Sequence, residues 1–144
     1  MAVINSNYYH RLSTMLRGES FDLSVMPDGP RANYVYLAPR SMHIGQYWSF
    51  QPASARGPTY AASSGILTYR VSSRFKGITM DLEFVNGGTD DLRVRLVSRG
   101  AYTGQFWIMT DAGRPGVGDV GLTGAYVNLT TTTLHGAGYK LDVT

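Results

Sequence analysis

The sequence predicts an all-β protein, and composition, residue alternation and internal repetition carry the prediction. Ten tyrosines and 17 glycines occur without a long run of Ala, Glu, Lys and Leu, which favours short strands joined by tight turns. Apolar and polar residues alternate with a period of two at 34–38 (YVYLA) and 93–97 (RVRLV), the pattern of half-buried strands. A length of 144 residues with 43% hydrophobic residues suits one compact domain with one core.

The chain repeats itself at an interval of 59 residues without a gap. A third copy begins at Ala125 and, in this alignment, places Asp142 beside Asp22 and Asp81. It reaches Thr144 before any Gln-x-Trp step, so we expect the third repeat to be truncated at the C-terminus. We therefore divide a single domain, residues 1–144, into units of about 8–66, 67–124 and a partial 125–144. The matches between the first two units include Arg11 with Arg70, Gly18 with Gly77, Leu23 with Leu82, Arg40 with Arg99 and Trp48 with Trp107.

Turn signals separate the expected strands. They are PDGP at 27–30, NGGTDD at 86–91 and a Gly/Pro-rich run at 113–124, and the threonines at 130–133 suit a β-branched strand. This spacing allows four short strands in a complete unit. Because one such unit cannot bury its apolar face alone, we expect three of them to close around a pseudo-threefold axis into a short barrel with a hairpin cap.

The two Gln-x-Trp steps, GQYWSF and GQFWIM, follow the steps FDL and MDL at the same spacing. With the unit openings YYHRLS, TYRVSS and AYVNLT, they resemble the ricin-B-type lectins and carbohydrate-binding modules, especially bacterial units of the YYRLT, LDV and GQYW type. The resemblance covers most of residues 8–144. It implies a β-trefoil with a truncated third repeat, acting as a non-catalytic lectin-like module with shallow, repeated sugar pockets.

In the lectins that this chain resembles, the aspartate of the Leu-Asp-Val step accepts hydrogen bonds from two sugar hydroxyls. The resemblance therefore assigns Asp22, Asp81 and Asp142 to carbohydrate binding. A carboxylate suits that task because it offers two acceptor oxygens in a fixed plane. The alternative is that each aspartate caps or braces its own hairpin, and the sequence leaves both interpretations open.

A sugar site also needs an aromatic ring on which the apolar face of the sugar can stack. The candidates are Tyr34, Tyr36 and His43 in the first unit, with Tyr36 at the aromatic position of the family. In the second unit Arg95 stands at that position, so the stacking role either passes to Tyr102 or is lost there. We take the Asp22 and Tyr36 pair as the preferred site.

The glutamines of the Gln-x-Trp steps, Gln46 and Gln105, belong to the same predicted sugar sites, and we expect them to tie their loops to backbone groups. We expect the tryptophans of these steps to fill the core. The family's asparagine before the step is replaced by Gly45 and Gly104, which removes the usual amide contact.

The residue inventory argues against an enzyme, a cofactor and a metal site. The chain has no cysteine, and its three histidines show no ligand spacing. The string GVGDVG at 116–121 matches G-x-G-x-x-G, but it precedes a β unit where a dinucleotide site needs a helix. No pair of carboxylates is expected to face across a cleft, as glycoside hydrolysis requires.

The expected partner is a glycan, and the expected location is extracellular or at the cell surface, although the first residues carry no signal peptide. The arginines that give the net charge of +3 are spread along the chain, so we expect no nucleic acid, and no apolar stretch predicts a membrane span. The alternative function is a structural or assembly subunit that contacts proteins through the trefoil. Its incomplete third unit would then be completed or covered by a protein partner or a second copy.

Overall fold

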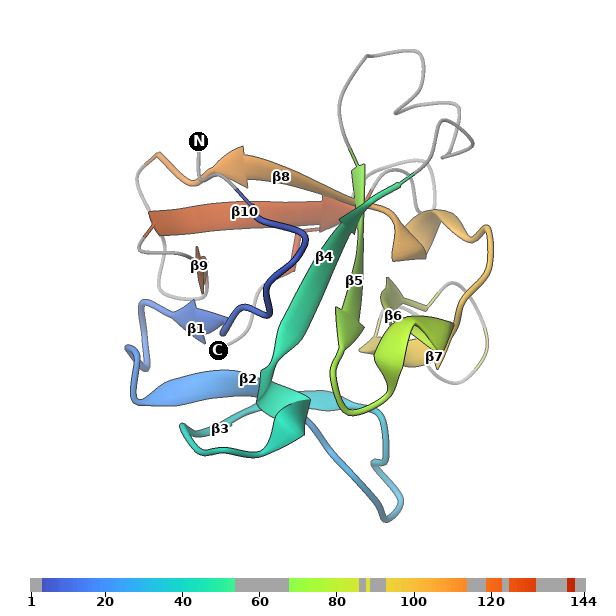
Figure 1. Ribbon diagram of the computed structural model, residues 1–144, viewed down its shortest axis with the longest axis horizontal. Coiled ribbons are helices and arrows are strands. Elements are labelled where there is room, and N and C mark those ends of the chain that lie inside the picture. Colours follow the sequence, from blue (N-terminus) through green and yellow to red (C-terminus); the bar gives the residue numbers. More distant parts are fainter. Residues whose placement is uncertain are drawn as a thin grey trace.

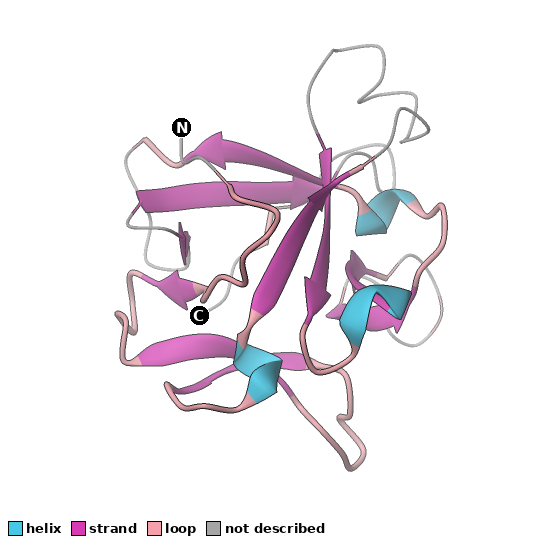
Figure 2. Cartoon of the chain, viewed as in Figure 1, coloured by secondary structure: helices cyan, strands magenta, loops and turns pink. Residues whose placement is uncertain are grey.

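The protein is described by a computed structural model that covers residues 4–53, 68–85, 88, 93–113, 119–122, 125–131 and 140–141. Strands dominate it, with three short 3₁₀ turns between them (Figure 2). The strands of the first unit are β1 (Ser13–Thr14), β2 (Phe21–Val25), β3 (Val35–Pro39) and β4 (Trp48–Pro52). Those that follow are β5 (Thr68–Ser73), β6 (Met80–Phe84), β7 (Val94–Ser98), β8 (Trp107–Asp111), β9 (Val120–Leu122) and β10 (Ala125–Thr131). The turns are η1 (Ile44–Gln46), η2 (Gly77–Thr79) and η3 (Thr103–Gln105).

The strands form a six-stranded barrel and two hairpin caps. The barrel order is β1-β9-β10-β8-β5-β4, and a bridge between His10 and Trp48 joins its two ends. In that bridge the His10 N–H donates to the Trp48 carbonyl at 2.7 Å and the Trp48 N–H donates back at 2.9 Å. The caps are the β2–β3 and β6–β7 hairpins, drawn below and to the right of the barrel in Figure 1. The all-β prediction is confirmed, and the strands expected at 34–38 and 93–97 lie within one residue of β3 and β7.

The pseudo-threefold relation appears in the strand register. His10 faces Trp48 in the first unit, and Tyr69 faces Trp107 at the equivalent place in the second. In the third unit Val127 faces Val120 on β9. Strand β9 therefore stands in the barrel place that a third Gln-x-Trp strand would take.

Strand β9 corrects the prediction that 113–124 is a turn run throughout. Val120 and Leu122 are apolar at a period of two and both are buried, so this segment inserts between β1 and β10 with Thr14 opposite Val120. By sequence, β9 falls in the second unit, yet it completes the third. It also precedes β10 in the chain, so the strands of the third unit come in a permuted order.

The register of the third unit also differs from the sequence alignment. The Leu141 N–H donates to the Leu129 carbonyl at 2.7 Å, as the Leu23 N–H donates to the Leu12 carbonyl at 2.7 Å. This match puts Lys140 at the position equivalent to Asp22. Asp142, which the sequence placed there, lies outside the described residues.

The core repeats the same tryptophan contacts in the first two units. Trp48 and Trp107 have no exposed surface, and their indole Nε1 atoms donate to the carbonyls of Leu23 and Leu82, each at 2.9 Å. Burial of rings of this size is worth about 3–5 kcal/mol each on truncation to alanine. The core cluster consists of Leu12, Leu23, Val25, Trp48, Phe50, Val71, Leu82, Leu96, Trp107, Met109, Val120, Leu122, Val127, Leu129 and Leu141. Over the described ranges, no helix has the length and apolarity needed to cross a membrane.

If β9 completes the barrel, replacing Val120 with aspartate should be costly, because the carboxylate would be buried between β1 and β10 without a partner. We expect Val120→Asp to lower the free energy of unfolding by about 3 kcal/mol or more. Thr110→Asp, at an exposed position of β8, is the control and should change it little. Both would be measured by urea denaturation, and equal midpoints for the two variants would show that β9 does not pack in the barrel.

Candidate functional site

Asp22 on β2 lies at the centre of a buried ion-pair network and has no exposed surface. Its Oδ2 accepts hydrogen bonds from Arg11 Nη1 at 2.9 Å and from Arg40 Nε at 2.7 Å. Its Oδ1 accepts from Arg40 Nη2 at 3.0 Å. Both carboxylate oxygens are therefore occupied by guanidinium groups, one approaching from the chain before β1 and the other from the end of β3.

The second unit reproduces this network around Asp81, which is also fully buried. Arg70 Nη1 donates to Asp81 Oδ2 at 2.7 Å. Arg99 donates from Nε and Nη2 to the two carboxylate oxygens, at 2.8 Å each. The four arginines are related by the same 59-residue shift as the two aspartates, so the network belongs to the repeat itself.

The glutamine shared by the two Gln-x-Trp steps lies beside each network and braces its loop. Gln46 Oε1 accepts from Arg11 Nη1 at 3.1 Å and from the Ser41 N–H at 2.9 Å, while its Nε2 donates to the Pro39 carbonyl at 2.9 Å. Gln105 makes the equivalent bonds to Arg70, Gly100 and Ser98, at 3.2, 2.8 and 2.9 Å. Both side chains are buried, as expected for groups that tie a loop to the backbone.

These contacts favour the bracing role that the sequence left open for Asp22 and Asp81. A sugar hydroxyl would reach either carboxylate only by displacing a guanidinium, because no part of the aspartate is exposed. Breaking such a buried charge pair is costly, since it leaves an uncompensated charge behind. In the described structure the two aspartates are therefore supports for the loops above them.

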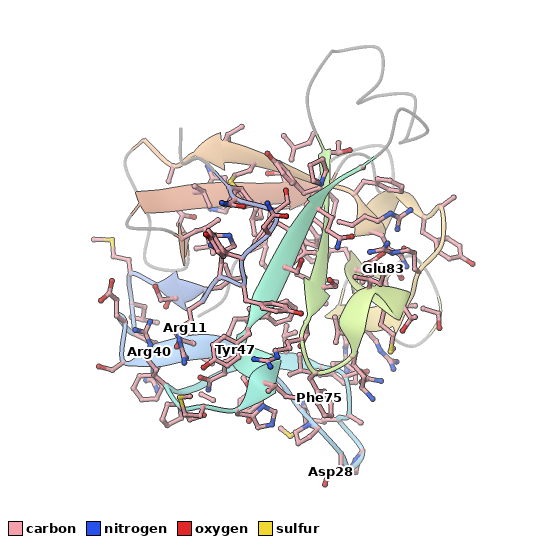
Figure 3. The ribbon with its side chains drawn as sticks, viewed as in Figure 1. Arg11, Asp28, Arg40, Tyr47, Phe75 and Glu83 are labelled. Atoms are coloured by element: carbon pink, nitrogen blue, oxygen red, sulfur yellow. The ribbon has the colours of Figure 1, made fainter. Side chains whose placement is uncertain are left out.

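The two arginines of the first network have different environments. Both terminal nitrogens of Arg11 donate hydrogen bonds within the protein. Nη1 donates to Asp22 and Gln46, and Nη2 donates to the Ser41 carbonyl at 2.8 Å and to Tyr47 Oη at 3.0 Å. Arg40 uses only Nε and Nη2, and 40% of its side chain is exposed. The pKa of Arg40 is raised above its ordinary value, first by its hydrogen bond to Asp22 and further by the charges of Asp22 and Glu19, against an opposing effect of burial. Figure 3 labels Arg11, Arg40 and the Tyr47 ring over which the Arg11 guanidinium lies.

The aromatic candidates fall into an exposed and an engaged group. His43 and Tyr102 occupy equivalent positions and are exposed, Tyr102 by 64%, and Tyr36 on β3 is 39% exposed. Tyr34 is half-buried, and Arg95 lies over its ring at 5.2 Å from the centroid. Tyr34 therefore belongs to the contact between the two hairpins. His43 is exposed but also engaged, since its Nδ1 accepts a hydrogen bond from the Gly45 N–H at 2.7 Å and its ring centroid lies 5.9 Å from that of Phe75. Tyr36, Tyr102 and the exposed part of His43 can meet a ligand.

Glycine precedes the Gln-x-Trp step because the loop passes very close to the hairpin there. A Cβ atom on Gly104 would stand 2.1 Å from the carbonyl oxygen of Phe84, a backbone atom that cannot turn away. At Gly45 it would stand 2.8 Å from the His43 ring and 3.3 Å from the Val25 nitrogen. The family's asparagine does not fit this loop geometry, and no amide contact to a sugar comes from this position.

The third unit carries a different ion pair. Lys140, at the position equivalent to Asp22, donates from Nζ to Asp119 Oδ1 at 2.7 Å. In this unit the residue at the aspartate position is thus a cation, and a carboxylate that precedes β9 holds it. In the other two units the residue at this position is a carboxylate and arginines hold it. Across the described part of the chain, no group of three His, Cys, Asp or Glu side chains could hold a metal ion.

The sequence interpretation missed the arginine partners of the aspartates. The signal was present, because Arg11 matches Arg70 and Arg40 matches Arg99 in the repeat alignment. Repetition shows that a position matters, but it does not show whether its side chain contacts a ligand or a neighbouring carboxylate.

Comparison with known proteins supports the fold alone. No protein-family model matches the sequence. No curated protein matches it either. Among solved structures, the chain is similar to the crystal structure of the designed 3-fold symmetric protein ThreeFoil, with a TM-score of 0.55 and 20% identity over 94% of this chain and 90% of that one. The chain is a β-trefoil, and this likeness says nothing of its ligand.

Removing the central charge of one network should destabilise the protein. In Asp22→Asn one oxygen becomes an amide that faces guanidinium donors, and we expect a loss of about 3–5 kcal/mol in the free energy of unfolding. Asp28→Asn, in the exposed hairpin turn, is the matched control and should leave it within about 0.5 kcal/mol. Thermal and urea denaturation measure both, and a wild-type midpoint for Asp22→Asn would contradict the bracing role.

Glu83 gives the second network a pH dependence. Its pKa is raised, first by burial, which outweighs the hydrogen bond from Gln105 Nε2 to Glu83 Oε1 at 2.8 Å and the charge of Arg95. The folded state therefore binds this proton more tightly than the unfolded state, and stability falls as pH rises above the unfolded value of about 4.3. We expect Glu83→Gln to be more stable than wild type at pH 7, with the difference shrinking toward pH 4. Denaturation midpoints across this range test it, and a constant difference would contradict the assignment.

Proposed function

We propose that this chain is a non-catalytic carbohydrate-binding module whose sugar sites lie at the η1 and η3 loops. The observation that carries the proposal is a repeated surface arrangement. In each of the first two units an exposed ring, His43 or Tyr102, follows an arginine that is bonded to a buried aspartate and whose side chain is 40% exposed in Arg40 and 30% exposed in Arg99. Rings that stack on the apolar face of a sugar, with hydrogen-bond donors beside them, are the usual means of sugar recognition.

The proposed contacts differ from those expected from the sequence. The aspartates and glutamines support the site from below, while the ligand meets the rings and the outer edges of the arginines. Tyr36 adds a further exposed ring on the first hairpin. Shallow sites of this kind bind weakly one at a time, so two related sites on one chain would act together by multivalency.

A binding role without catalysis fits the state of the buried acids. Asp22 and Asp81 are held by arginines, and Glu83 accepts a hydrogen bond from Gln105. Each is engaged in bracing the fold, and none of the three is presented to a substrate. An extracellular or cell-surface location would suit a module of this kind.

The assembly alternative has less support than the sequence suggested. It rested on an open barrel edge in the third unit, but β9 and the bridge at His10 close the ring formed by the described strands. Its remaining support is a scatter of exposed apolar side chains. They include Met15, Leu16, Met42, Ile44 and Ile78.

A glycan array combined with sedimentation velocity separates the two functions. We expect a monomer that binds glycans, and we expect Tyr102→Ala to weaken binding about three- to tenfold through loss of the stacking ring. Tyr8→Ala removes a ring of similar exposure, 65%, from a segment outside η1 and η3 and should not change binding. A stable assembly that binds no glycan would refute the proposal in favour of the assembly role.

A further inference from the structure

We infer that the glycan is acidic and that its carboxylate or sulfate groups bind the outer edges of Arg40 and Arg99. This inference rests on the proposed function and names the ligand class of the same sites. It follows from how the two arginines are held, from the charge count of their networks and from the residues that surround them.

Each arginine is held so that one binding edge remains. A guanidinium has five N–H donors in a plane and can pair with an anion through Nε and one Nη, or through both Nη atoms. Arg40 and Arg99 pair with aspartate through Nε and Nη2. No described residue accepts a hydrogen bond from Nη1 of either arginine, and their side chains are 40% and 30% exposed. The edge formed by Nη1 and the second hydrogen of Nη2 thus remains for a second anion.

The charge count points in the same direction. Each network pairs one carboxylate with two guanidinium groups, Asp22 with Arg11 and Arg40, and Asp81 with Arg70 and Arg99. Glu83 also lies beside the second network, bonded to Gln105, but burial raises its pKa and so favours its neutral form. Within the ion pairs, each network keeps one positive charge that no carboxylate compensates. An anion at the outer edge would neutralise it, and an arginine already fixed by its first partner loses little further side-chain freedom on binding.

The surroundings make the second unit the stronger site. Glu19 lies close enough to Arg40 for its charge to act on the guanidinium and would compete with an acidic ligand. The residue equivalent to Glu19 in the second unit is Ile78, which is uncharged and 55% exposed. Tyr102 stands three residues after Arg99, and its ring packs against Gly100. A sugar ring on Tyr102 would therefore lie beside the Arg99 edge.

Paired polysaccharides that differ only in charge test the inference. Binding of the full chain to dextran sulfate and to oligogalacturonate is compared with binding to dextran and to the methyl-esterified oligogalacturonate. The two acidic probes separate sulfate from carboxylate recognition. The variants are Arg99→Lys and Arg40→Lys. Lysine keeps the positive charge that Asp81 and Asp22 need but lacks the outer pair of N–H donors that would bind a second anion. Arg31→Ala, in the exposed first hairpin turn, is the control for loss of a surface charge.

We expect tighter binding of an acidic probe than of its neutral counterpart, weakened about tenfold by Arg99→Lys, less by Arg40→Lys and not by Arg31→Ala. Equal binding of acidic and neutral probes would overturn the inference while leaving the proposed function standing. Absence of binding to any glycan would overturn both. A single-stranded oligonucleotide of equal charge that binds as tightly, with the same arginine dependence, would show that the sites take polyanions other than glycans. Melting temperatures close to that of wild type keep the lysine variants interpretable.

Discussion

The buried pairing of one aspartate with two arginines is the constraint on which the loops of this trefoil depend. A carboxylate without exposed surface must be compensated, because an isolated charge in the interior costs several kcal/mol. Asp22 and Asp81 obtain this compensation from segments distant in sequence, the start of a unit and the end of its second hairpin strand. Each network thus fixes the opening strand, the hairpin and the Gln-x-Trp loop relative to one another, while the tryptophan holds the same loop from the core side.

In the third unit, β9 occupies the barrel place of a Gln-x-Trp strand although the order of the strands along the chain is changed. Filling that place therefore matters more to the barrel than the order of its strands in the chain. Val120 and Leu122 supply the apolar side chains that Trp48 and Phe50 supply in the first unit, although β9 precedes β10 in the chain. The lysine at the central position of that unit carries the opposite charge, and Asp119 reverses its role accordingly. In that unit the buried charge is Asp119 and Lys140 is 42% exposed, so the carboxylate is still the group that needs compensation, although it comes from a different segment.

The parts of the structure that could be predicted from the sequence are those that repeated residue patterns encode. Alternation located β3 and β7, and the spacing of the Gln-x-Trp steps placed Trp48 and Trp107 in equivalent core positions. Strand β9 was not predictable, because three residues inside a Gly-rich run are too few to show the alternation that distinguishes a strand from a turn. The displacement of Asp142 by Lys140 arises because Leu129 and Leu141 are one residue further apart than Leu12 and Leu23. A braced aspartate and a sugar-binding one look the same in sequence, since both need a carboxylate at one step of one hairpin.

Covering each buried aspartate with an arginine changes the chemistry of the loop face from acceptor to donor. A carboxylate selects hydroxyls, which donate to it, whereas a guanidinium offers only N–H groups and therefore selects acceptors. Sugar hydroxyls can accept as well as donate, so the change does not remove the capacity to meet a sugar. It moves the preference toward the strongest acceptors that a glycan carries, its carboxylate and sulfate groups. The buried aspartate then acts through the arginine, because it fixes the plane and direction of the donor edge before any ligand arrives.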